Sequence, residues 1–273
     1  MAEDRWQTTE GRRQNQMSNE PKNAGFSLAE VLLAIGVLAV GVLFVAGVFP
    51  VSVHLTTVVA EQTIAAIAAD EAFAKVKIYA NGAGGIDFNS GGVVTNQLKD
   101  FNDVLVGVTI DPCEFAYPSI DMPMEEKHYC WTALCRRVAP DPNRLVQVTV
   151  FVCRKVSPNL LYPDPAGSDT VDRPMPVKVG VSGTAGDNEL TITGDKRFIN
   201  DGYMIVDDKT GQIYRVLERY ADDTSTPTIE EDAIVLLDRN WEGGLPGNVW
   251  VVPPPVGGGR GPCVGVYQKV IRF

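Results

Sequence analysis

The chain has 273 residues, of which 45% are hydrophobic and 21% charged, and it carries a net charge of −10. This composition excludes a disordered or collagen-like chain and predicts one or two globular domains. The acidity argues against a nucleic-acid-binding protein, because neutralising phosphates requires a basic surface.

An apolar run near the N-terminus is the first informative segment. No Asp, Glu, Lys or Arg lies between Glu30 and Glu61, and residues 31–53 are almost wholly apolar. A helix rises about 1.5 Å per residue, so residues 26–49 would span roughly 36 Å, more than the ~30 Å hydrocarbon core of a bilayer. The run therefore predicts a membrane span over about residues 31–53. A secretory signal peptide is disfavoured, since the small residues precede the apolar run instead of following it.

The residues just before this run form a motif. Residues 24–30 read AGFSLAE, which puts glycine, an aromatic residue and a single carboxylate ahead of the apolar segment. This segment resembles the N-terminal motif of type IV pilin-like proteins, in which glutamate stands five places after the glycine. The resemblance implies that a prepilin peptidase cleaves after Gly25 and methylates the new N-terminus at Phe26. Residues 1–25 would then be a leader peptide, and the apolar helix would stay in the product.

Glu30 has a physical role in this interpretation. A charged side chain costs up to about 3 kcal/mol at the centre of a bilayer and less near the interface, so it usually has a partner. Cleavage before Phe26 would expose an α-amino group that is cationic at neutral pH. In a staggered filament, the amine of one subunit would neutralise Glu30 of its neighbour. The alternative is a carboxylate that reaches the lipid headgroups.

The basic residues predict the orientation of the span. Arg12, Arg13 and Lys22 precede the run, and the next basic residues are Lys75 and Lys77. Loops rich in Lys and Arg stay in the cytoplasm. We therefore expect a single-pass protein of the cytoplasmic (inner) membrane, with its N-terminus inside and its C-terminal part outside.

Several residues within the run bear on helix packing. Gly36, Gly41 and Gly47 would let neighbouring helices approach closely, although glycine is also common in membrane helices generally. Pro50 removes one helical hydrogen bond and predicts a kink or local melting, as the resemblance to filament-forming pilins also implies. His54 lies just beyond the run and is expected at the interface.

Residues 58–78 predict an amphipathic continuation of the same helix. Glu71 precedes Lys75 by four residues, the favourable order for a helical ion pair. One helix over residues 26–78 would lie first in a membrane or filament core and then against a sheet, and the glycine-rich residues 81–85 would end it. The apolar face would consist of Ala65, Ala68, Ala69, Ala72, Phe73 and Val76.

Residues 79–156 predict a β domain. Apolar residues alternate over Val104–Ile110, as on a half-buried strand. Tyr129–Val138 and Leu145–Cys153 would form a hairpin around the turn at 140–143. A hairpin symmetric about residues 141 and 142 would place Cys130 opposite Cys153, so a disulfide between them is a hypothesis beside that of buried free thiols.

The remaining chain predicts a proline-rich linker over residues 157–176 and a small all-β module over residues 177–273. A hairpin turn is expected at Asp208–Gly211, and the module would be a barrel or a sandwich. The expected strands are Val177–Ser182, Glu189–Thr193, Tyr203–Asp207, Gln212–Arg219, Ala233–Asp238, Val249–Val252 and Val264–Arg272.

Motifs for catalysis and metal binding are weak. The two histidines and five cysteines lack the paired spacing of zinc sites, and the sequence has neither a Gly-x-Ser-x-Gly elbow nor a P-loop. Acidic groups without EF-hand spacing are expected to be solvated, with calcium binding as the alternative, so no cofactor and no metal site are predicted. These groups are Asp207 with Asp208, Asp222 with Asp223, and residues 230–232.

Together these patterns predict an α+β fold, in which a long N-terminal transmembrane helix packs on an antiparallel, pilin-like sheet and a small all-β module follows. The resemblance implies a minor pilin or pseudopilin of a type II secretion system or type IV pilus, not an enzyme. Its partners would be prepilin peptidase, other pilins, an inner-membrane assembly platform and the lipid bilayer, and no nucleic acid is expected. Two alternatives are a tip adhesin or DNA-uptake component that binds a ligand through residues 177–273, and an uncleaved single-pass membrane enzyme.

Overall fold

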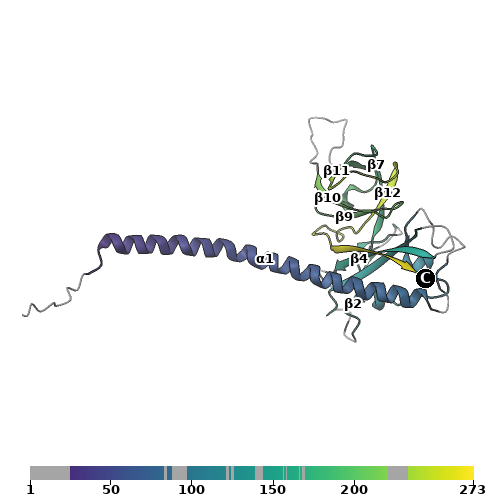
Figure 1. The fold of residues 1–273 in the computed structure, drawn as a ribbon, viewed down its shortest axis with the longest axis horizontal. Helices are drawn as coiled ribbons and strands as arrows, with labels where there is room; N and C mark the ends of the chain where they lie inside the picture. Colours follow the sequence, from purple (N-terminus) through teal and green to yellow (C-terminus); the bar gives the residue numbers. More distant parts are fainter. Residues whose placement is uncertain are drawn as a thin grey trace, which may run out of the picture. The chain divides into compact units, whose positions relative to one another are not determined.

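The computed structural model shows an α+β chain with one long N-terminal helix, antiparallel sheets and a closed barrel (Figure 1). The chain divides into two compact units, one ending at Leu55 and one running from Thr56 to Phe273, and each is described by itself. The structure describes residues 25–82, 85–87, 97–120, 123, 126–138, 144–155, 157, 159–165, 167, 170–220 and 233–273.

The long helix α1 comprises Leu28–Ala80, close to the predicted 26–78. It remains helical through Pro50, so the predicted local melting does not occur, and the kink stays a prediction. The predicted ion pair between Glu71 and Lys75 is present at 3.6 Å. Its buried residues in the second unit include the whole apolar face expected from the sequence, and are Glu61, Ala65, Ala68, Ala69, Ala72, Phe73, Val76 and Ala80.

The main sheet of the second unit has the hairpin β3 (Tyr129–Arg137) and β4 (Leu145–Arg154) at its centre. Both strands match the prediction, while the turn at 140–143 lies outside the described residues. The predicted register is confirmed, since Cys130 faces Cys153. The short strands β1 (Lys99–Asp100) and β2 (Ala116–Tyr117) pair with β3, and the long strand β13 (Cys263–Arg272) pairs with β4.

Small residues on α1 allow the helix to approach this sheet closely. The buried alanines of α1 share one core with inward-facing residues of β3 and β4, such as Trp131 and Val150. The ring centroids of Trp131 and Phe115 lie 4.9 Å apart, which fills the space that the alanines leave. The opposite face of the hairpin, including Leu134 and Phe151, packs in a second cluster with barrel residues. The hairpin is thus buried on both faces.

The predicted strand Val104–Ile110 is wrong. Asp100 caps a short helix α2, Phe101–Val104, and only Leu105 forms a bridge, an isolated one with Ile86. Alternation indicates a half-buried strand only where a neighbouring strand supplies hydrogen bonds. Here the bridge at Leu105 is the single described pairing of the segment, and Val106 is exposed.

The proline-rich segment packs against the fold. A two-stranded pairing of β5 (Tyr162–Pro163) with β6 (Thr170–Val171) interrupts it, and the Tyr162 side chain is fully buried. The amide of Val256 donates to the carbonyl of Leu161. The described part of residues 157–176 is therefore anchored in the second unit.

The all-β module contains a closed antiparallel barrel with the strand order β10, β11, β8, β7, β12, β9 (Figure 1). Closure removes the exposed edges that an open sheet would have. The predicted turn at Asp208–Gly211 joins β9 to β10, and the Asp207 carboxylate accepts hydrogen bonds from the amide and hydroxyl of Thr210. The barrel strands are β7 (Val177–Gly183), β8 (Glu189–Ile192), β9 (Met204–Asp207), β10 (Ile213–Arg219), β11 (Ile234–Leu237) and β12 (Gly247–Val251).

The last strand corrects the predicted module boundary. The expected all-β module includes Val264–Arg272, but β13 pairs along its whole length with β4 of the main sheet. The barrel is therefore inserted between β4 and β13. Strand periodicity identifies both strands correctly, but it does not specify which strand pairs with which.

Candidate functional site

The N-terminal motif coincides with the start of α1. The Ser27 hydroxyl accepts a hydrogen bond from the Glu30 amide at 3.2 Å, and the helix begins at Leu28. Serine at the N-cap with glutamate three residues later is the capping-box sequence. Gly25 and Phe26 therefore precede the helix, and the Phe26 side chain is 81% exposed. The peptide bond between them is accessible and lies outside helical hydrogen bonding.

The glycines of the motif and the apolar run have no steric role within the described chain. A Cβ atom added at Gly25, Gly36, Gly41 or Gly47 would meet no atom within 4 Å. These glycines therefore leave open space beside the helix that no described part of the chain fills. In an apolar helix, open positions of this kind are compatible with the close approach of a neighbouring helix, and glycine is also common in membrane helices generally.

The first part of α1 exposes a continuous apolar surface. Among the described residues, α1 alone is long and apolar enough to cross a membrane, and none of its most apolar window is buried. Leu43, Phe44 and Phe49 are each about 70% exposed. Glu30 and His54 are also exposed, at the two ends of the apolar run of residues 31–53. In water, such a surface would be strongly unfavourable, so it needs lipid or other helices around it.

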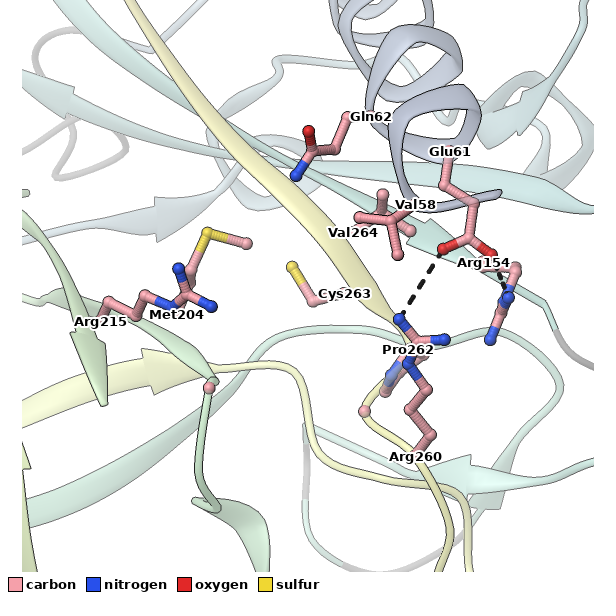
Figure 2. A pocket seen from close by; sticks show the side chains of 12 residues that line it. Val58, Glu61, Gln62, Arg154, Met204, Arg215, Arg260, Pro262, Cys263 and Val264 are labelled. Atoms are coloured by element: carbon pink, nitrogen blue, oxygen red, sulfur yellow. Dashed lines mark hydrogen bonds and ion pairs between the residues drawn. The ribbon is translucent and has the colours of Figure 1, made fainter. Parts of the chain in front are cut away.

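The second unit contains a charged hollow of about 260 Å³ (Figure 2). Its described lining residues include Arg154, Arg215 and Arg260, with Glu61 as the sole carboxylate and Cys263 as the sole thiol among them. Glu61 forms an ion pair with Arg154 and a longer one, 3.9 Å, with Arg260 (Figure 2). Asp201 lines the adjoining hollow that shares Arg215, Arg260 and Cys263, so three guanidinium groups stand against two carboxylates, and the remaining positive charge suits an anionic ligand.

The hypothesised disulfide between Cys130 and Cys153 is not formed, and the alternative of buried free thiols holds for both residues. All five are free thiols, Cys113 is exposed, and Cys135 is buried on the helix-facing side of the sheet. Cys153 does face Cys130 as predicted, but it also faces Cys263 on its other side. No local pattern in the sequence points to this third thiol, because finding it requires knowing that β13 pairs with β4.

The expectation that Asp207 and Asp208 are solvated is wrong, because both are buried and have hydrogen-bond partners. Asp207 caps its turn, and buried Asp208 accepts hydrogen bonds from Trp250 at 2.7 Å and from Lys178 at 3.2 Å. The groups at 222–223 and 230–232 lie outside the described residues. Within the described ranges, no three His, Cys, Asp or Glu side chains are grouped so as to hold a metal ion.

Comparisons with protein-family models, curated proteins and solved structures find no match to this chain. Three features of the chain bear on its function, namely the capped N-terminal motif, the exposed apolar helix, and the arginine-lined hollow beside three adjacent thiols.

Proposed function

We propose that the protein is a minor pilin or pseudopilin, which prepilin peptidase processes and which assembles into a type II secretion pseudopilus or a type IV pilus. The observation that carries the proposal is the coincidence of the Gly25 to Glu30 motif with the start of a helix whose first part is apolar and exposed. A subunit that passes from a bilayer into a helical filament would have apolar surroundings in both places. Its function is assembly, without a catalysed reaction.

The geometry at Gly25 supports processing. Proteases cleave accessible segments outside regular structure, and the capping of α1 by Ser27 leaves the bond between Gly25 and Phe26 in such a segment. The chain itself has no steric need for glycine at position 25. A requirement for glycine there would thus come from the peptidase.

Glu30 supports a role in assembly. It stands at the cytoplasmic end of the proposed span, and no other charged residue follows until Glu61. In the filament, the methylated amine of Phe26 from one subunit would neutralise Glu30 of the next, which would fix the axial offset between helices. The inner-membrane assembly platform would receive the subunit with its N-terminus in the cytoplasm and its second unit outside.

The second unit supports a low-copy subunit. The later part of α1 packs on an antiparallel sheet, as in the proposed pilin-like arrangement, and the inserted barrel adds bulk. A repeating shaft requires close lateral packing, which this additional mass would crowd. A position at the tip, or another rare position, would accommodate the barrel.

Replacing Gly25 by alanine is expected to abolish processing. Wild-type protein expressed with an active prepilin peptidase should carry a methylated N-terminus at Phe26, and the Gly25→Ala variant should retain residues 1–25. Gly36→Ala is the matched control, because both glycines have open space around them and only one borders the cleaved bond. Intact-mass and N-terminal peptide mass spectrometry measure both outcomes. Wild-type protein that keeps its leader beside active peptidase would exclude the proposal.

A Glu30→Gln variant is expected to be processed but not assembled. Glutamine still suits the capping box, so helix α1 should start normally, but the charge that pairs with the neighbouring amine is lost. Filaments are sheared from cells of the source organism, and the amount of processed protein in them should fall at least about ten-fold. This corresponds to a loss of about 1.4 kcal/mol in the free energy of assembly. Glu218→Gln, on the exposed barrel surface, should leave that amount unchanged. Normal assembly of Glu30→Gln would contradict the pairing.

A further inference from the structure

Three thiols lie side by side across three neighbouring strands. Cys153 on the central strand β4 faces Cys130 on β3 and Cys263 on β13. Directly opposed residues of antiparallel strands have Cα atoms about 4.5–5.5 Å apart, within the 4.4–6.8 Å range that disulfides span. Cys153 is thus within bonding reach of two thiols, and it can bond only one of them at a time.

The backbone hydrogen bonds distinguish the two pairs. The amide of Lys155 donates to the carbonyl of His128, so the alternation along the ladder makes Cys130 and Cys153 a hydrogen-bonded pair. The amide of Arg154 donates to the carbonyl of Pro262, which makes the adjacent Cys153 and Cys263 a non-hydrogen-bonded pair. Side chains approach more closely in the non-hydrogen-bonded arrangement. This favours the bond between Cys153 and Cys263, a pair that lies beside the register shift of β13 between Cys263 and Gly265.

Access to solvent also distinguishes the two thiols beside Cys153. Cys130 and Cys153 are 6% and 1% exposed, whereas Cys263 is half-buried and lines the arginine-rich hollow (Figure 2). Burial, together with hydrogen bonding to Cys130 and Cys263, raises the pKa of the Cys153 thiol well above its usual range. Because the thiolate is the nucleophile, Cys153 is a poor first attacker and Cys263 is the accessible one.

We propose that the Cys263 thiolate first attacks an anionic small-molecule disulfide bound among Arg154, Arg215 and Arg260, and that Cys153 then attacks the Cys263 sulfur of the resulting mixed disulfide, which forms a disulfide between β4 and β13. The excess positive charge of the hollow would concentrate such an oxidant beside Cys263. This inference goes beyond filament assembly and does not require it.

The reaction balances with the disulfide as its sole oxidant. The Cys263 thiolate attacks one sulfur of R–S–S–R, the S–S bond breaks, and the departing thiolate takes a proton to become R–SH. Cys153 then loses its proton and attacks the Cys263 sulfur, and the second R–S⁻ leaves and is protonated. Two protein thiols are oxidised, and one small disulfide is reduced to two thiols.

The product would link the strands on either side of the barrel insertion. The described barrel strands all lie between Cys153 and Cys263 in the sequence, so the bond would close a covalent loop around the whole insertion. Such a bond restricts the unfolded chain and should raise the unfolding midpoint of the second unit relative to the reduced protein.

The test uses the reduced full-length protein in detergent. One sample is incubated with oxidised glutathione, which is anionic, and another with cystamine, which is cationic. The reactions are quenched by alkylation, and the peptides are mapped by mass spectrometry without reduction. We expect a mixed disulfide at Cys263, then a Cys153 to Cys263 bond, forming at least about ten-fold faster with glutathione at low salt. Replacing Arg215 and Arg260 together by glutamine should bring the two rates close together.

Cysteine variants test each step separately. In Cys153→Ala, the mixed disulfide at Cys263 should accumulate. Cys130→Ala and the exposed-site control Cys113→Ser should still form the bond. A product that links Cys130 to Cys153, a first adduct at Cys130 or Cys153 instead of Cys263, or equal wild-type rates at Cys263 with the two disulfides would each overturn the proposal.

Discussion

Replacing Trp131 by alanine is expected to lower the free energy of unfolding of the second unit by about 3–5 kcal/mol. The side chain is fully buried in the core shared by α1 and the main sheet, where it packs at a tilt against the Phe115 ring. Its indole nitrogen has no hydrogen-bond partner among the described residues, so the loss is one of packing. Small domains are stable by about 5–15 kcal/mol, which makes this a large fraction of the total.

Denaturant unfolding, followed by circular dichroism of the detergent-solubilised protein, measures this loss. The control is Val270→Ala on β13, where the side chain is 58% exposed and truncation should change the free energy of unfolding by less than about 0.5 kcal/mol. A Trp131→Ala loss below about 1 kcal/mol would mean that α1 and the sheet do not pack around this indole.

Replacing Glu61 by alanine is expected to lower the free energy of unfolding of the second unit by about 2–3 kcal/mol. Glu61 is the one buried carboxylate of α1, and it joins the helix to Arg154 of β4. Its removal leaves Arg154, whose side chain is 27% exposed, without that partner. The loss should stay below that of a fully buried pair, because water still reaches part of Arg154.

A second ion pair, which also joins α1 to the main sheet, is the matched control. Asp70 of α1 and Lys269 of β13 approach to 2.6 Å, but their side chains are 73% and 52% exposed. Exposed pairs contribute about 0–1 kcal/mol, so Asp70→Ala should have a small effect that salt reduces further. Equal losses for Glu61→Ala and Asp70→Ala in denaturant unfolding would show that burial of Glu61 contributes nothing.

Local patterns predict the elements better than their pairing. Helix α1 and the hairpin of β3 and β4 follow from periodicity and turn residues within short windows, and the structure confirms both. The partner of β13 lies more than a hundred residues earlier in the chain, and no short window contains that information. The prediction for Val104–Ile110 is wrong for a related reason, since alternation without a neighbouring strand does not make a strand.

The candidate sites differ in the same respect, since one is a local motif in the sequence and the others form only when the chain folds. Gly25, Phe26 and Glu30 lie within six consecutive residues, so their motif can be recognised from the sequence alone. The hollow is assembled from α1, β4, the barrel and the segment before β13, and its charges come together only on folding. Cys263 has no distinctive neighbours in the sequence, and its relevance comes from facing Cys153.

The position of β13 affects the order in which the chain can fold. Synthesis proceeds from the N-terminus, and the ten residues of β13 are made after every described barrel strand. Until then, β4 has an open edge of unpaired N–H and C=O groups that can pair with another chain. The closed barrel can form before the sheet is complete, since none of its described strands depends on β13 for pairing. A chain that stalls or is cut before Cys263 would therefore carry a finished barrel beside an aggregation-prone strand edge.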